Sequence, residues 1–350
     1  MKYNKILAVG VTGALLFSIT GSVKPLNIAN ATETPQTNTT NTLDVKNLQD
    51  GIYSIDVDIM HASNKKQKSM MDGTVEKDQT RLIVENGQYK VRLTFHSLKK
   101  EFNGSQLTGW LGKLGYPLEN GEFAPSTVLS RYTKNITNEK DYPRVLEYPI
   151  DKNEIQDNKL ETKVQVYVQV MENIHKGSGT QVAKPTFDFS KIKVIDKSSD
   201  ALTKDLLELK ENFKKEVKGL SNITEEESKN LASEVTSINS RENLAKLVAK
   251  AYKLDNISEF IADNAPDLKK EEKEKYKKDY IDAQTEEKEQ EVRENIKASE
   301  EKNSKDIETV KQVAKEKIQS LQNLEQKERE NYISKITAET EISKIHEIEK

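Results

Sequence analysis

The sequence changes character near residue 200, and this change limits the possible folds more than any other feature. Before it lie the only tryptophan and all but one of the glycines and prolines; after it come Gly219, Pro266 and a stretch dense in Lys, Glu, Asn and Leu. Glycine and proline separate short strands, whereas long stretches without them are typical of helices. We therefore expect an all-β N-terminal part followed by an all-α part.

The first part, residues 48–196, alternates between apolar and polar side chains in several short runs. The clearest runs are 52–59 and 164–170, together with 81–84 and 89–95, which flank an Asn-Gly pair. Asn-Gly between two alternating runs is a strong hairpin signal. About seven or eight short strands in this length predict an immunoglobulin-like β-sandwich.

The second part contains an imperfect repeat of about fifty residues. We expect three-helix modules at 203–255, 256–302 (a degenerate copy) and 303–350, the last of them possibly truncated. In the first module the helices are expected near 206–218, 225–236 and 241–254, with Thr224 and Ser240 as N-caps. A single long coiled coil is the alternative, but sustained heptads are missing.

The N-terminus has the pattern of an export signal. Lys2 and Lys5 precede an apolar run over 6–20 and an Ala-x-Ala site at 29–31. This pattern predicts a signal peptide at 1–31 and a disordered leader at 32–47; a membrane anchor is the alternative, but the run is short for one. We expect a secreted or cell-surface protein of a Gram-positive bacterium. The chain shows no Leu-Pro-x-Thr-Gly sorting signal, so we expect a fragment or a protein not wall-anchored by itself.

Composition argues against several classes of function. The chain has no cysteine, which removes thiolate chemistry, and its four histidines are dispersed. A net charge of −3 provides no basic field for nucleic acid. The sequence contains no Ser/His/Asp grouping, no phosphate-binding glycine loop and no His-Glu-x-x-His motif. We therefore expect a binding protein and not an enzyme.

Three motifs in the β part resemble the NEAT domain, a haem-binding module of Gram-positive surface proteins. They are K-S-M-M-D-G at 68–73, E-N-G-Q-Y-K-V at 85–91, and V-Q-V-M-E-N-I at 168–174 with G-S-G-T-Q at 177–181. In that family the first motif forms a helical lip over the haem, and the third belongs to a hairpin below it. The resemblance implies a haem site between these two segments.

The family's best-known iron ligand, a Tyr in a Y-x-x-x-Y motif, has no counterpart here, because no Tyr lies between Tyr167 and the end of the β part. Some members that carry Met in both segments use thioether ligands, which suit haem iron. Met is also a common filler of core gaps, and strand packing is the favoured interpretation of Tyr167. The candidate haem-binding residues are Ser69 (toward a propionate), Met70, Met71, Met171, His175 and Tyr167, with the three Met as axial candidates.

Trp110 lies in a glycine-rich segment, L-T-G-W-L-G-K-L-G-Y at 107–116. Packing beneath a loop is the favoured interpretation, and contact with a host protein or a haem edge is the alternative.

The helical repeats resemble GA modules, three-helix bundles of bacterial surface proteins, some of which bind serum albumin. The matched pattern begins L-S-N-I at 220–223 and L-Q-N-L at 321–324, each followed by a Glu. We expect a haem-acquisition protein that takes haem or haemoglobin and exchanges haem with other surface haem-relay proteins. The alternative function is an adhesin that binds serum albumin or a similar host protein, and the helices are alternatively only a stalk.

Overall fold

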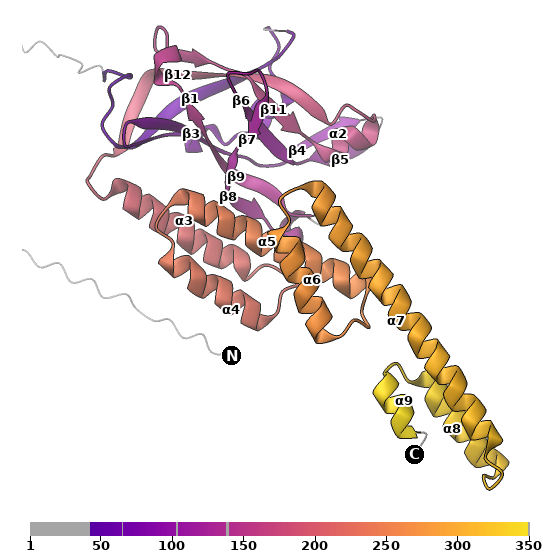
Figure 1. The fold of residues 1–350 in the computed structure, drawn as a ribbon. Coiled ribbons are helices and arrows are strands. Elements are labelled where there is room, and N and C mark those ends of the chain that lie inside the picture. Colours follow the sequence, from indigo (N-terminus) through magenta and orange to yellow (C-terminus); the bar gives the residue numbers. More distant parts are fainter. Residues whose placement is uncertain (1–42, 65, 103, 138–139, 349–350) are drawn as a thin grey trace, which may run out of the picture. The chain divides into compact units, whose positions relative to one another are not determined.

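The computed structural model describes residues 43–64, 66–102, 104–137 and 140–348, which belong to one compact unit (Figure 1). The expected signal peptide and most of the expected leader lie outside the described residues. Among the described residues, no helix is both long and apolar enough to cross a membrane.

The N-terminal part is an antiparallel β domain, as expected. Its main sheet runs in the order β7-β6-β11-β12-β1-β2-β3-β9-β8, with β10 paired to β12, and β4 and β5 form a separate ribbon. The strands are β1 (Gly51–His61), β2 (Arg81–Glu85), β3 (Gln88–Thr94), β4 (Leu98–Phe102), β5 (Ser105–Gly109), β6 (Lys113–Pro117), β7 (Phe123–Pro125), β8 (Thr127–Tyr132), β9 (Tyr142–Ile150), β10 (Lys159–Glu161), β11 (Val164–Tyr167) and β12 (Thr180–Asp196).

Short helices interrupt the strands. They are η1 (Met70–Thr74), η2 (Lys77–Gln79), α1 (Lys134–Thr137), η3 (Lys152–Glu154) and α2 (Gln169–Ile174). The expected hairpin turn between β2 and β3 is confirmed: Asn86 and Gly87 both have positive φ, 51° and 70°, as a tight primed turn requires.

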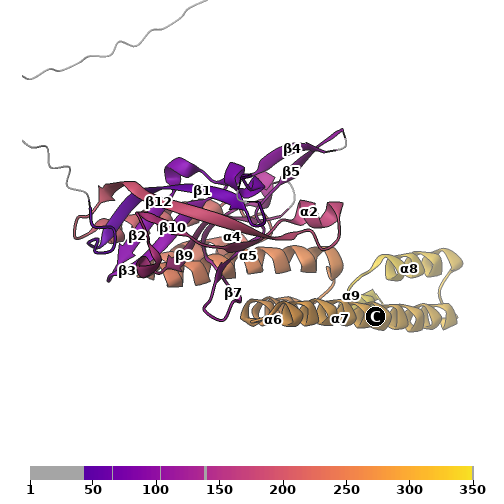
Figure 2. The same cartoon turned by 90° about the horizontal axis from the view of Figure 1, so that it is seen from above.

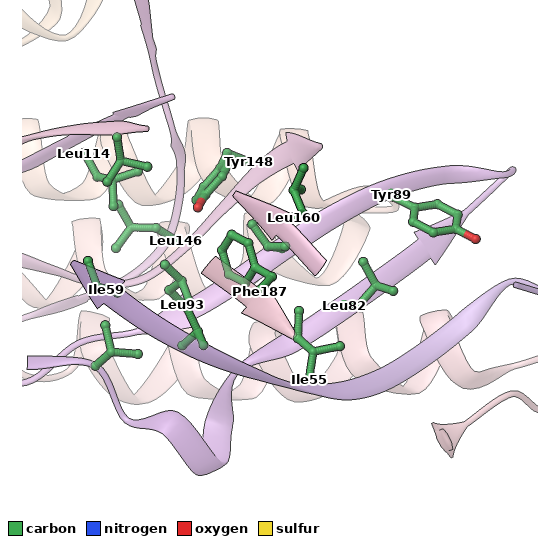
Figure 3. Close-up of a cluster of buried hydrophobic side chains, with 14 of the residues drawn as sticks. Ile55, Ile59, Leu82, Tyr89, Leu93, Leu114, Leu146, Tyr148, Leu160 and Phe187 are labelled. Atoms are coloured by element: carbon green, nitrogen blue, oxygen red, sulfur yellow. The ribbon is translucent and has the colours of Figure 1, made fainter. Parts of the chain in front are cut away.

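The strands of the main sheet enclose the core of the β domain. Tyr148 and Phe187 contact each other there, with ring centroids 6.4 Å apart. Figure 3 shows the labelled members of this core, which come from strands distant in sequence: Ile55, Ile59, Leu82, Tyr89, Leu93, Leu114, Leu146, Tyr148, Leu160 and Phe187. Alternate side chains of β1 and β12 point into it, as the period-2 pattern predicts.

The C-terminal part is helical, as expected. Its elements are α3 (Ala201–Val217), α4 (Glu225–Glu234), η4 (Val235–Ser237), α5 (Arg241–Asn264), α6 (Lys270–Asp282), α7 (Glu286–Ser320), α8 (Gln326–Ala338) and α9 (Ile342–Ile348). Both expected N-caps are confirmed. Thr224 caps α4 in a capping box with Glu227, and Ser240 accepts a hydrogen bond from the Asn243 N–H of α5.

Two helices continue through positions at which we expected boundaries between modules. α5 runs past residue 255 and α7 past residue 302. The first half of α5 packs in a core with α3 and α4, and its second half, with Ile257 and Ile261, packs in a core with α6 and α7. Successive modules therefore share helices instead of being joined by loops.

The first module packs against the β domain, with α3 and α5 in contact with β8 and Val145 of β9 packed against the same core (Figure 1). Leu129 of β8 is 1% exposed, and it belongs to the same apolar core as Phe213 of α3 and Leu244 of α5. A β-domain side chain thus completes the core of the helical module.

A buried network of charges crosses the same contact. Arg92 of β3 donates through Nε to Glu147 of β9 at 2.6 Å, and its two Nη atoms donate to both oxygens of Asp205 of α3 at 2.6 and 2.8 Å. Arg241 of α5 donates to Asp205 at 2.6 Å and to Glu85 of β2 at 3.3 Å. Because each buried cation meets carboxylates from both parts, the network holds the first module in a specific register on the sheet.

Glu216 of α3 makes this contact sensitive to pH. Its carboxylate accepts hydrogen bonds from Ser130 Oγ at 2.5 Å and from the Arg131 N–H at 3.3 Å. Burial raises its pKa to about 7, although these bonds and the nearby charges of Arg144 and Arg131 oppose the rise. The folded state favours the neutral form of this carboxyl group. The free energy of unfolding is therefore highest below the ordinary pKa of 4.5 and falls as pH rises from there through about 7.

We expect Glu216→Gln to remove this pH dependence, because glutamine carries no charge at any of these values. The variant should be about 1–2 kcal/mol more stable than the parent at pH 8, allowing for the solvent that reaches this half-buried side chain, and nearly equal to it at pH 5. Urea denaturation at the two pH values measures the difference. An equal effect at both values would contradict the assignment.

Candidate functional site

The lip that we expected over the haem is η1, and ion pairs fix it to β1. Asp72 accepts the Ile59 N–H at 2.9 Å and Lys77 Nζ at 2.7 Å. Lys68 donates to Asp58 at 2.8 Å and to Asp72 at 3.1 Å. Burial acts to raise the pKa of Asp72, but the bonds from Lys77, the Ile59 N–H and Lys68 outweigh it and lower the pKa. The lip is therefore anchored by a carboxylate that stays ionised.

The candidate residues of the lip differ in how accessible they are. The Ser69 hydroxyl oxygen caps η1 by accepting the Met71 N–H at 3.2 Å. Met70 is 44% exposed, whereas Met71 is 6% exposed and packs in the core of the β domain. Of the two lip thioethers, only that of Met70 is available at the surface, so the geometry favours Met70 over Met71.

The third motif forms a helix where the alternation predicted a continuing strand. β11 ends at Tyr167, and α2 follows. Glu172 of α2 accepts the N–H groups of Gly177 at 2.8 Å and of Gly179 at 2.9 Å. A Cβ on Gly179 would lie 2.8 Å from the Glu172 side chain. β11 and β12 form the hairpin that the resemblance implied, and α2, closed by these two glycines, is the connection between them.

The remaining candidates lie on or beside α2. Met171 is half-buried on the helix, and His175 is exposed at its C-cap, with a ring nitrogen 2.8 Å from the Lys176 carbonyl oxygen. The Tyr167 hydroxyl donates to Gln169 Oε1 at 3.0 Å, so it is occupied within its own segment.

The β4–β5 ribbon joins the two sides of the site. β4 contacts η1, and β5 contacts α2, which both views place beside it (Figures 1 and 2). A Cβ on Gly73 of the lip would lie 3.6 Å from Leu98 of β4, and a Cβ on Gly109 of β5 would lie 3.3 Å from Val170 of α2. The lip and α2 are thus two flanks of one region of the surface.

An aromatic cluster next to α2 is the feature that sequence reasoning weighed least. The Trp110 ring stacks on Tyr142 with centroids 5.8 Å apart and planes at 11°, and it meets Tyr132 at 5.0 Å. Lys140 Nζ lies 5.7 Å from the Tyr142 ring and 3.4 Å from Gln169 Oε1. The sequence singled out Trp110 because it lies among glycines. It did not indicate the partners of the ring, because these come from β8 and β9, which are distant in the chain.

The chemistry of these residues fits haem. Met70 and Met171 present thioethers on the two flanks, Trp110 and Tyr132 provide partly exposed aromatic surface, and Lys140 is a cation suited to a propionate. The described residues contain no cluster of three or more His, Asp or Glu side chains arranged to hold a bare metal ion. The thioether, aromatic and cationic side chains are the groups that a haem, with its own iron, would need from the protein.

An antiparallel β domain bearing a lip and joined to three-helix modules defines a class of modular binding protein. The Iron Transport-associated (NEAT) domain model matches residues 46–186, and the GA module model matches 204–257 and 306–350. The chain thus contains a NEAT domain followed by GA modules, as the resemblance implied. Both are binding domains typical of Gram-positive surface proteins.

One solved structure that the chain resembles is a mutant of the IsdX2 NEAT5 domain in complex with haem. The identity is 23%, the match covers 40% of this chain and 97% of that one, and the TM-score is 0.28. None of the curated proteins matches this sequence.

Proposed function

We propose that this protein is an exported haem-acquisition protein, in which the NEAT domain binds haem between the lip and α2 and passes it on by ligand exchange. The supporting observation is the placement of the exposed Met70 and the half-buried Met171 on the two flanks of a region that also holds Trp110. Haem supplies the iron chemistry when bound. The chain would supply thioether donors, aromatic contact and a cation, and no covalent step is required.

Export to the cell surface follows from the signal-peptide pattern and suits this role. Haem or haemoglobin would be the source, and other surface haem-relay proteins would be the recipients. A site that releases its ligand by exchange needs donors near the surface, which the 44% exposure of Met70 provides.

The test uses the unit Leu43–Lys350, because the first helical module shares a core with the β domain. Ferric haem is added, and the Soret band is followed after gel filtration. We expect retained haem in the parent and an altered spectrum in Met171→Leu or Met70→Leu, because leucine offers no iron ligand at nearly equal volume. Met60→Leu on β1 is the matched control. Loss of haem from the parent on the column overturns the proposal, and an unchanged spectrum in both Met variants with a changed one in His175→Ala moves the ligand to His175.

The C-terminal GA module, which matches residues 306–350, supports a second candidate function, the capture of serum albumin. The first module is covered on α3 and α5 by the β domain, whereas Val313 of α7 is 58% exposed and Leu321, at the C-cap of α7, is 41% exposed. Helical partner recognition uses apolar side chains exposed on one face of a helix.

Immobilised albumin distinguishes a binder from a stalk. We expect Val313→Lys to reduce capture of the chain at least several-fold, whereas Leu207→Lys, at a 52% exposed leucine of the first module, leaves it unchanged. Loss of capture in Leu207→Lys alone would move the binding surface to the first module. No capture of the parent chain would leave the helices as a stalk.

A further inference from the structure

The aromatic cluster beside α2 is built largely from the strand ends that the first helical module contacts. Tyr132 is the last residue of β8, Tyr142 is the first of β9, and the two are paired across the sheet. Trp110 packs against both rings, and the neighbouring Gly112 N–H donates to the Tyr167 carbonyl at 2.7 Å. The position of the cluster relative to α2 therefore depends on where β8 and β9 end.

α5 holds these strand ends through side chains that face the β domain. The Tyr252 hydroxyl donates to the Arg131 carbonyl at 3.2 Å, and Asn256 Nδ2 donates to Asp141 Oδ1 at 3.1 Å. Arg131 Nη1 in turn donates to the second oxygen of Asp141 at 3.0 Å. Arg131 and Asp141 immediately precede Tyr132 and Tyr142, so one small network of bonds fixes both aromatic residues.

The carboxylate and the tyrosine of this network are shielded from water, which makes their geometry specific. The Asp141 side chain is 10% exposed, and Tyr252 is 3% exposed. The Arg131 guanidinium also lies 5.6 Å from the Tyr252 ring. Removing one partner leaves a buried polar group unsatisfied, and the strand ends must then shift or admit water.

We propose that the first helical module positions the ligand site of the NEAT domain, with Asn256 and Tyr252 of α5 acting as positioning residues through Asp141 and Arg131. The effect on the ligand rests on the proposed function, because haem is the ligand of that site. The placement of the aromatic cluster by α5 is independent of haem. Neither residue reaches the cluster itself; each acts on the residue next to an aromatic ring.

Trp110 allows this coupling to be measured without haem, because it is the only tryptophan in the chain. The fluorescence of Leu43–Lys350 and its quenching by acrylamide report directly on the aromatic cluster. We expect Asn256→Ala to raise the quenching constant about twofold and Tyr252→Phe to raise it less, since phenylalanine keeps the ring and loses only the hydroxyl. The dissociation rate of ferric haem should rise by about 3- to 10-fold in Asn256→Ala.

Glu242→Gln is the matched control. It removes the 2.8 Å ion pair between Lys90 of β3 and Glu242 of α5, which crosses the same contact but does not involve Arg131 or Asp141. We expect the control to change neither the quenching nor the haem release.

The outcomes separate the two proposals. Parent-like quenching in Asn256→Ala overturns the positioning role, whether or not haem binds. Altered quenching with parent-like haem release shows that α5 places the cluster, and it overturns the expected increase in the rate of haem dissociation. A parent chain that binds no haem overturns the proposed function, and the quenching still decides whether α5 places Trp110 and its partners.

Discussion

Replacing Asp205 by alanine is expected to lower the free energy of unfolding of the β domain and first module by about 3–5 kcal/mol. Asp205 is the carboxylate that Arg92 and Arg241 share, and the two arginine side chains are 10% and 3% exposed. Without it, both guanidinium groups lose their shortest bonds to α3 while remaining buried. An uncompensated buried charge is among the most destabilising changes a folded chain can undergo.

Urea denaturation at neutral pH measures this loss. Asp200→Ala is the control, because Asp200 precedes the same helix but its ion pair is with Lys204, and both side chains are more than half exposed. We expect the control to change stability by less than about 0.5 kcal/mol. Similar small losses in both variants would contradict a structural role for the network.

The contribution of Asp205 should also depend on pH in a defined direction. Burial acts to raise its pKa, but hydrogen bonds and charge pairing with Arg92 and Arg241 outweigh burial and lower it from 3.8. A lowered carboxyl pKa gives stability that is present above the unfolded value and is lost as pH falls through the folded one. The difference between parent and variant should therefore be constant above about pH 5 and shrink in acid.

Leu129→Ala is expected to cost about 2–5 kcal/mol, the range for removing most of a fully buried leucine side chain. Leu129 belongs to β8, yet the core it fills is that of the first module, with Phe213 and Leu244. The loss should therefore shift the unfolding of helix and sheet together, as a single transition.

Far-ultraviolet circular dichroism, which the helices dominate, and the fluorescence of Trp110 in the β domain follow the two parts during the same denaturation. Leu118→Ala, at a leucine of the β domain that is 42% exposed, serves as the control and should change little. Separate transitions in Leu129→Ala, with the helical one unshifted, would show that the module folds without the sheet.

Local patterns predicted much of the fold, because they act within a few residues. The Asn86-Gly87 turn requires positive φ, and Thr224 and Ser240 satisfy the free N–H groups at helix starts. The alternation along β1 and β12 indicated which side chains enter the core. Each of these requirements is set by the residue and its immediate neighbours.

Alternation gave the wrong prediction for residues 168–170, for a physical reason. Val168 and Val170 continue the pattern of β11, but their partners lie elsewhere in the chain: Gly109 leaves room for both, and Glu172 bonds the N–H groups of Gly177 and Gly179. The tertiary contacts override the weak strand preference of a short segment.

Short-range patterns were enough to predict the change from strands to helices near residue 200, the helix caps and the motifs of the lip and of α2. Long-range packing sets the burial of Met71 and the exposure of Met70, the stacking of Trp110 on residues from β8 and β9, and the hold of α5 on those strand ends. These features depend on contacts between residues far apart in the chain, which no local period encodes. The boundary at residue 200 is therefore a change of secondary structure, and the physical core extends across it.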